Sequence, residues 1–156
     1  MPREPGRGAD GPRVLLGRDH QRLRQLLTGL VEEFEEGDPD DLRDTWARFE
    51  EHLQAHLGAE ESHILPLFDA VEPAEARALR AEHVAFRRTV EELAVGVDLH
   101  AVRLDAVREF ADALRRHAER EDRLMYRFAE REVPEADREA IARAVGGDRA
   151  ARRDEE

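Results

Sequence analysis

Apolar residues recur along most of the chain in alternating steps of three and four, the spacing that places them on one face of an α-helix. Four long segments have this period, and proline or glycine separates them. We expect helices over about 12–36, 39–65, 73–95 and 98–132. A short fifth helix should begin at Pro134 and end near Val145. Pro66 should kink or end the second helix, and Gly96 should end the third.

Short connections between long amphipathic helices favour antiparallel neighbours. The pattern therefore predicts an all-α fold, an up-down-up-down antiparallel four-helix bundle over residues 12–132. A flexible leader over 1–11, rich in glycine, proline and charge, should precede the bundle. The short fifth C-terminal helix and a frayed tail should occupy 133–156.

Polar side chains interrupt the apolar face of the second helix. After Leu53 the three-and-four spacing continues with His56, Glu60 and His63 before Leu67. His56 and Glu60 are four residues apart, which puts both on one side of a helix, about one turn from each other. Both should point into the core, where an unpaired carboxylate is strongly unfavourable.

The fourth helix repeats this pattern with His117 and Glu121, followed by Leu124. The first and third helices carry His20 and His83 on their apolar faces, each directly after an acidic residue. The sequence thus resembles two related helical hairpins, each with two histidines and one glutamate. The segment lengths should bring these side chains into one layer of the bundle.

A metal ion is the simplest source of positive charge between two buried carboxylates. The chain has no cysteine, so thiolate metal sites and disulfides are excluded, and imidazole with carboxylate suits iron, manganese and zinc. The alternative is a hydrogen-bonded polar layer that fixes the register of the helices. The candidate metal ligands are His20, His56, Glu60, His83, His117 and Glu121.

Several polar residues near this layer have open roles. Glu61 and Asp122 could hydrogen-bond the ligand histidines or lie on a solvated rim. His63 could ligate, line the site or simply pack, and His52 is expected at the surface or the rim. Tyr126 is expected to point largely away. The sequence offers no base-activated nucleophile and no glycine-rich phosphate loop, so no catalytic residue is assigned.

The four histidines and two glutamates, in this order, resemble the hemerythrin-like HHE cation-binding domain over about residues 14–132. The resemblance implies a centre of two non-haem iron ions of the Fe–O–Fe type, with bridging carboxylates and terminal histidines. Zinc or manganese is less favoured. It also implies a position where dioxygen or a related small molecule, such as peroxide or nitric oxide, binds.

Two positions depart from the oxygen-carrying members of that family. Those members have a second histidine one turn after the third-helix histidine, where this chain has Arg87. They also place the last carboxylate five residues after the fourth-helix histidine, a spacing that Asp122 has and Glu121 does not. One ion should therefore have an open position or a substitute ligand, with Glu82, His52, His63 or water as the alternatives.

These features favour a redox or sensing role. The alternatives are a small redox enzyme, peroxide-consuming or oxidase-like, and an iron-binding or structural bundle. A net charge of −12 argues against nucleic-acid or anionic-membrane binding. No apolar run is long enough to span a membrane, so we expect a cytoplasmic protein. It should be a monomer or weak oligomer, and nothing in the sequence identifies a protein partner.

Overall fold

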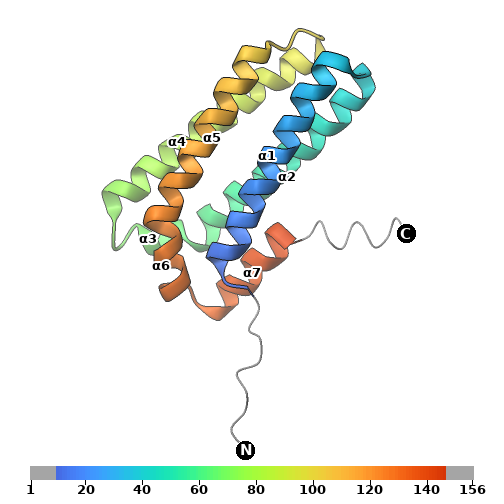
Figure 1. The fold of residues 1–156 in the computed structure, drawn as a ribbon. Helices are drawn as coiled ribbons and strands as arrows, with labels where there is room; N and C mark the ends of the chain where they lie inside the picture. The colour runs from blue at the N-terminus through green and yellow to red at the C-terminus, as the bar shows by residue number, and fades with distance from the viewer. Residues whose placement is uncertain (1–9, 147–156) are drawn as a thin grey trace, which may run out of the picture.

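The computed structural model describes residues 10–146, and within them the chain is helical with no strand (Figure 1). Most of the leader expected over 1–11, and the tail expected after the last helix, lie outside the described residues. The helices are α1 (Pro12–Glu36), α2 (Pro39–His63), α3 (Leu65–Phe68), α4 (Pro73–Asp98), α5 (Leu104–Arg123), α6 (Met125–Glu132) and α7 (Glu135–Gly146).

The long helices α1, α2, α4 and α5 form a helical bundle (Figure 1). α1 packs against α2 and α5, and α4 packs against the same two helices. α3 and α6 follow α2 and α5 at one end of the bundle. There α7 lies across the bundle and packs against α1 and α2. None of the described helices is long and apolar enough to cross a membrane.

Proline and glycine set the helix boundaries between α1 and α2 as the sequence predicts. Pro39 occupies the first turn of α2, where its missing amide hydrogen costs nothing, and the Asp38 side chain accepts a hydrogen bond of 2.9 Å from the Asp40 amide. Gly37 ends α1 so closely that a Cβ there would lie 2.7 Å from the Glu33 carbonyl oxygen. A larger residue at this position would have to displace the last turn of α1.

The end of α4 differs from the prediction. Gly96 lies inside the helix, which continues to Asp98 because its apolar face has one further buried residue, Val97. The chain turns over residues 99–103, where His100 adopts a left-handed φ of 55°. His100 therefore belongs to the connection, and the helix that was expected from about residue 98 begins at Leu104.

Two helix breaks change which side chains face the core. α2 ends at His63, just before Pro66, and Ile64 has φ −117° and ψ −55°. The helix expected over 98–132 is broken in the same way at Leu124, with φ −131° and ψ −59°. Each break shifts the register of the following turn. Leu67, in the turn after the first break, and Leu124, the residue at the second, were expected on the apolar face but are 37% and 39% exposed.

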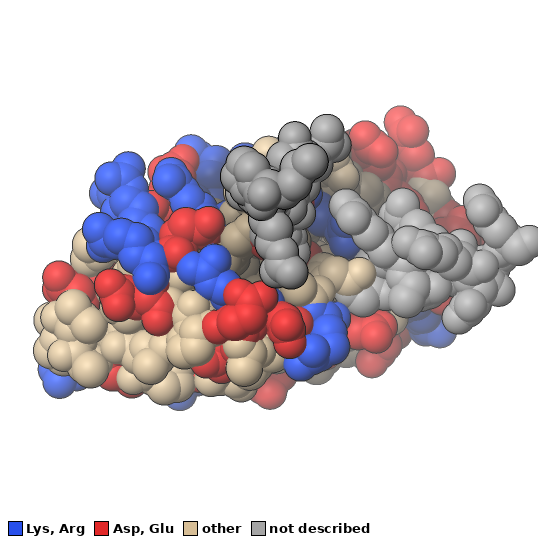
Figure 2. All heavy atoms as spheres, turned by 90° about the horizontal axis from the view of Figure 1, so that it is seen from below, with Lys and Arg blue, Asp and Glu red and all other residues tan. Residues whose placement is uncertain are grey.

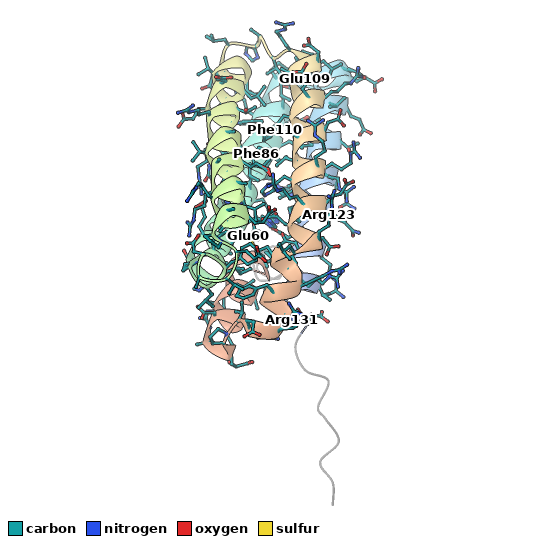
Figure 3. The ribbon with its side chains drawn as sticks, turned by 90° about the vertical axis from the view of Figure 1, so that its left-hand side faces the viewer. Glu60, Phe86, Glu109, Phe110, Arg123 and Arg131 are labelled. Carbon is teal, nitrogen blue, oxygen red and sulfur yellow. The ribbon has the colours of Figure 1, made fainter. Side chains whose placement is uncertain are left out.

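The apolar core consists of two clusters. The larger cluster lies towards the α1–α2 and α4–α5 connections and includes Trp46, Phe49, Phe86 and Phe110. The other cluster, which includes Tyr126, lies where α3, α6 and α7 meet the start of α1. In Figure 3, Phe86 and Phe110 lie above Glu60 along the bundle. The surface at the α7 end carries intermixed arginine and acidic side chains (Figure 2).

Candidate metal centre

The six predicted side chains meet in one buried layer. They form two groups, in each of which one ligand atom per residue lies within 4.8 Å of the others. Glu60 and Glu121 belong to both groups, whereas each histidine belongs to one. The first group is His20, His56, Glu60 and Glu121, and the second is Glu60, His83, His117 and Glu121. Two neighbouring cation positions that share two carboxylates would have this arrangement.

Each glutamate contacts histidines from both hairpins. Glu121 Oε1 lies 3.2 Å from His20 Nε2 and 3.0 Å from His117 Nε2. Glu60 Oε1 lies 3.4 Å from His56 Nε2 and 3.5 Å from His83 Nε2. The imidazoles thus present their Nε2 atoms to a common centre, and the register of the four long helices places them at one height.

The carboxylate oxygens have few hydrogen-bond partners. Both oxygens of Glu60, and Oε2 of Glu121, are buried without a hydrogen bond from any described residue. Both side chains are 0% exposed. Buried carboxylate oxygens without donors are costly, so oxygens in this state favour a cation between them.

The pKa values of the side chains in the layer also show that the site favours positive charge. Burial opposes protonation of His83, but the negative charge of the adjacent Glu121 and Glu60 carboxylates outweighs it and raises the pKa of His83 to about 10. Burial also opposes protonation of His117, but Glu121 and the other nearby carboxylates outweigh it and raise the pKa of His117 to about 9. Burial and the adjacent Glu121 raise the pKa of Glu60. Burial acts in the same sense on Glu121, but His117 and the neighbouring hydrogen bonds outweigh it and lower the pKa of Glu121.

Asp19 orients the histidines of α2, a role that the sequence analysis missed. Its two carboxylate oxygens accept hydrogen bonds of 2.6 Å from His56 Nδ1 and His52 Nε2. Burial would raise the pKa of Asp19, but these two hydrogen bonds lower it to about 2. A bond from Nδ1 fixes the His56 tautomer that turns a free Nε2 towards Glu60. The repeated acidic residue before each first histidine was the available signal.

The second hairpin has a similar but looser set of partners. Glu61 accepts a hydrogen bond of 2.9 Å from His83 Nδ1, and Arg87 donates two bonds of 2.7 Å to the same carboxylate. Arg87 therefore supports His83 through Glu61. Glu82, the counterpart of Asp19, lies 3.4 Å from His117 Nδ1.

The residues suggested as substitute ligands have other partners. His52 is hydrogen-bonded to Asp19, and His63 Nδ1 is hydrogen-bonded to Asp137 Oδ1 on α7 at 2.8 Å. The carboxylate of Asp122 pairs with Arg13 at the surface and is 51% exposed, so Glu121 is the member of that pair that lies in the layer.

The prediction for Tyr126 was wrong. Its side chain is buried, and its hydroxyl lies 2.6 Å from His20 Nε2 and donates a 3.2 Å hydrogen bond to Glu121 Oε1. The break at Leu124 causes this, because it turns the residue five positions after Glu121 towards the layer. No proline or glycine marks the break, so the sequence carried no local signal for it.

Removing the Asp19 carboxylate should weaken metal binding, because His56 would lose the partner that fixes its tautomer. We expect Asp19→Asn to reduce metal affinity by about 10–100-fold. The matched variant Glu82→Gln should have a smaller effect, since its contact with His117 is longer and the Glu82 side chain is partly exposed. Competition with a chromogenic chelator measures both affinities. An equal or larger loss in Glu82→Gln would contradict this account of the layer.

The chain was compared with known proteins in three ways. Residues 12–140 match the model of the hemerythrin HHE cation-binding domain. No curated protein and no solved structure gave a match. The match spans α1 to α6 and part of α7 and contains all six residues of the buried layer. By this match, the chain belongs to the hemerythrin HHE cation-binding domain family.

Proposed function

We propose that the protein is a non-haem di-iron protein, with its four long helices in an up-down-up-down arrangement. His20 and His56 would hold one ion, His83 and His117 the other, and Glu60 and Glu121 would bridge the two. The observation that carries the proposal is the sharing of two fully buried carboxylates between two groups of histidines. A layer that only fixed the helix register would need donors for those carboxylate oxygens, and three of them have none among the described residues.

Iron is the metal that we propose, with zinc and manganese less favoured. When bound, an iron pair would supply electrons for chemistry with dioxygen, peroxide or nitric oxide. The protein would hold the imidazoles in fixed tautomers through Asp19, Glu61 and Glu82. Phe86, whose ring centroid lies 4.9 Å from that of His117, would keep water from one side of the layer.

The burial of the layer favours a small ligand. His56, Glu60, His83 and Glu121 are each 0% exposed, so an organic substrate could not reach the carboxylates without rearrangement of the helices. A molecule of two to four atoms would need a far smaller opening, which local fluctuations of the packed side chains would supply. We therefore propose that the protein binds dioxygen, peroxide or nitric oxide in a redox or sensing role.

Iron content tests the proposal. Protein produced with ample iron should contain close to two irons per chain, and Mössbauer spectroscopy of the oxidised sample should show a magnetically coupled pair. Protein with only zinc, or with a single ion, would overturn it. Mixing the loaded protein with peroxide then distinguishes a peroxide-consuming enzyme from a binding or sensing protein, because only the enzyme would turn over many equivalents.

A further inference from the structure

Resting on the proposed function, we propose that Tyr126 is a further ligand, which binds as a phenolate to the ferric ion held by His20 and His56. The two ions of the pair would then differ in their protein donors. The ion beside His83 and His117 would have fewer donors, so the small molecule would bind on that side.

The position of the hydroxyl carries the proposal. The Tyr126 oxygen lies 2.6 Å from His20 Nε2, 3.2 Å from Glu121 Oε1 and 3.4 Å from His56 Nε2. Ligands at right angles on an octahedral ion with bonds of about 2.1 Å are about 3 Å apart. The hydroxyl lies near this spacing from Glu121 Oε1 and His56 Nε2, and closer than it to His20 Nε2, with which it shares a hydrogen bond in the metal-free layer. A neighbouring ligand on the same ion would occupy this place.

Among the described residues, the Tyr126 hydroxyl has no polar partner outside the candidate metal centre. Tyr126 is 1% exposed and packs within the apolar cluster at the α7 end, so its hydroxyl is its one polar group in a buried site. Its ring centroid is 5.8 Å from that of His20. Every hydrogen-bond partner that the described residues offer it belongs to the candidate metal centre.

The other hairpin has no such donor. Tyr126 is five residues after Glu121 and two after the break at Leu124. The residue five after Glu60 is Leu65, and the residue two after the break at Ile64 is Pro66, so neither position has a donor side chain. Leu65 is fully buried and cannot ligate a metal. The two halves of the layer, otherwise so alike, therefore differ by one oxygen donor.

Binding would exchange one bond for another without a change in oxidation state. The phenol O–H bond breaks, an oxygen–iron(III) bond forms, and the proton passes to solvent. A phenolate bound to ferric iron absorbs visible light through charge transfer from the ring to the metal. This absorption provides a readout that is independent of any activity.

The chain contains a single tyrosine, so a tyrosinate signal can come from Tyr126 alone. The wild-type protein is loaded with ferrous iron and oxidised in air, and its iron is counted. Its visible absorption and resonance Raman spectra are then recorded. We expect a visible charge-transfer band whose Raman spectrum shows tyrosinate ring vibrations. The Tyr126→Phe variant should lose the band completely when absorbance is expressed per iron bound.

A matched control keeps one tyrosine in α6 but moves it out of the layer. Adding Phe128→Tyr to Tyr126→Phe should not restore the band, because Phe128 packs against Phe68 in the apolar cluster. Wild-type protein with two irons but no tyrosinate vibrations would overturn the ligand assignment and leave the di-iron proposal intact. Wild-type protein that binds no iron would overturn both. A band in the control would show that the signal comes from elsewhere and would also overturn the assignment.

Discussion

Replacing either shared carboxylate should remove iron from the protein. We expect Glu60→Gln and Glu121→Gln each to lose at least one of the two irons, because both side chains contribute to both groups of candidate ligands. Glutamine keeps the shape of glutamate but removes the charge and one of the two ligand oxygens. Iron analysis of protein purified in parallel measures the loss.

Asp122→Asn is the control for charge in the same stretch of α5. Asp122 follows Glu121 directly, but it pairs with Arg13 at the surface, so this variant should retain both irons. If Asp122→Asn loses iron while Glu121→Gln retains it, the five-residue spacing is the operative one and the assignment of Glu121 is wrong.

The same variants should have opposite effects on the metal-free protein. The pKa of Glu60 is raised, by burial and by Glu121, so its ionised form destabilises the fold at neutral pH. The pKa of Glu121 is lowered because His117 and the neighbouring hydrogen bonds outweigh burial, so its ionised form stabilises the fold. After chelation, Glu60→Gln should melt about 2–4 °C higher, equivalent to about 1 kcal/mol. Glu121→Gln should melt lower than the wild type.

Periodicity predicted the features that depend on continuous helices. The bounds of α1 and the start of α2 agree with it, because proline and glycine mark them. The convergence of His20 with His56 also follows from segment length, and their ring centroids are 4.3 Å apart. The expected ligand roles of the six residues stay a prediction, although the structure brings all six together.

The features that periodicity missed depend on breaks and on tertiary hydrogen bonds. An uninterrupted helix would turn Tyr126 away and Leu124 inwards, and the break at Leu124 reverses both. Asp19 was missed for a different reason. It lies beside the apolar face of α1, and only the packing of α2 shows that its carboxylate meets two imidazoles. Neither feature can be read from the spacing within one helix.

Metal affinity should depend steeply on pH. His83 and His117 must be neutral to bind a metal, but their pKa values in the metal-free fold are about 10 and about 9. At pH 7 both carry protons that the metal must displace. The overall affinity for the pair of ions should therefore fall by about 100-fold or more for each pH unit of acidification near neutrality, roughly tenfold for each proton.

The stability of the metal-free fold should change in the opposite direction. The raised pKa values of these two histidines stabilise the fold fully below the unfolded value of about 6.5, and this contribution is lost as the pH rises through about 9 and 10. Chelator competition at two pH values measures the affinity, and thermal melts of the chelated protein measure the stability. The Asp122→Asn variant should show the same dependence of metal affinity on pH as the wild-type protein. A slope near zero would mean that the metal displaces no protons.

The division of the apolar core has a consequence for how quickly metal exchanges. The two clusters lie on opposite sides of the polar layer, and the cluster at the α7 end is built largely from the short helices α3, α6 and α7. Short helices at the end of a bundle can open locally at a lower free energy than the whole domain. Such an opening would uncover the layer while the larger cluster stays folded. Metal exchange would then follow the population of this locally opened state, and amide hydrogen exchange in α6 and α7 would share its timescale.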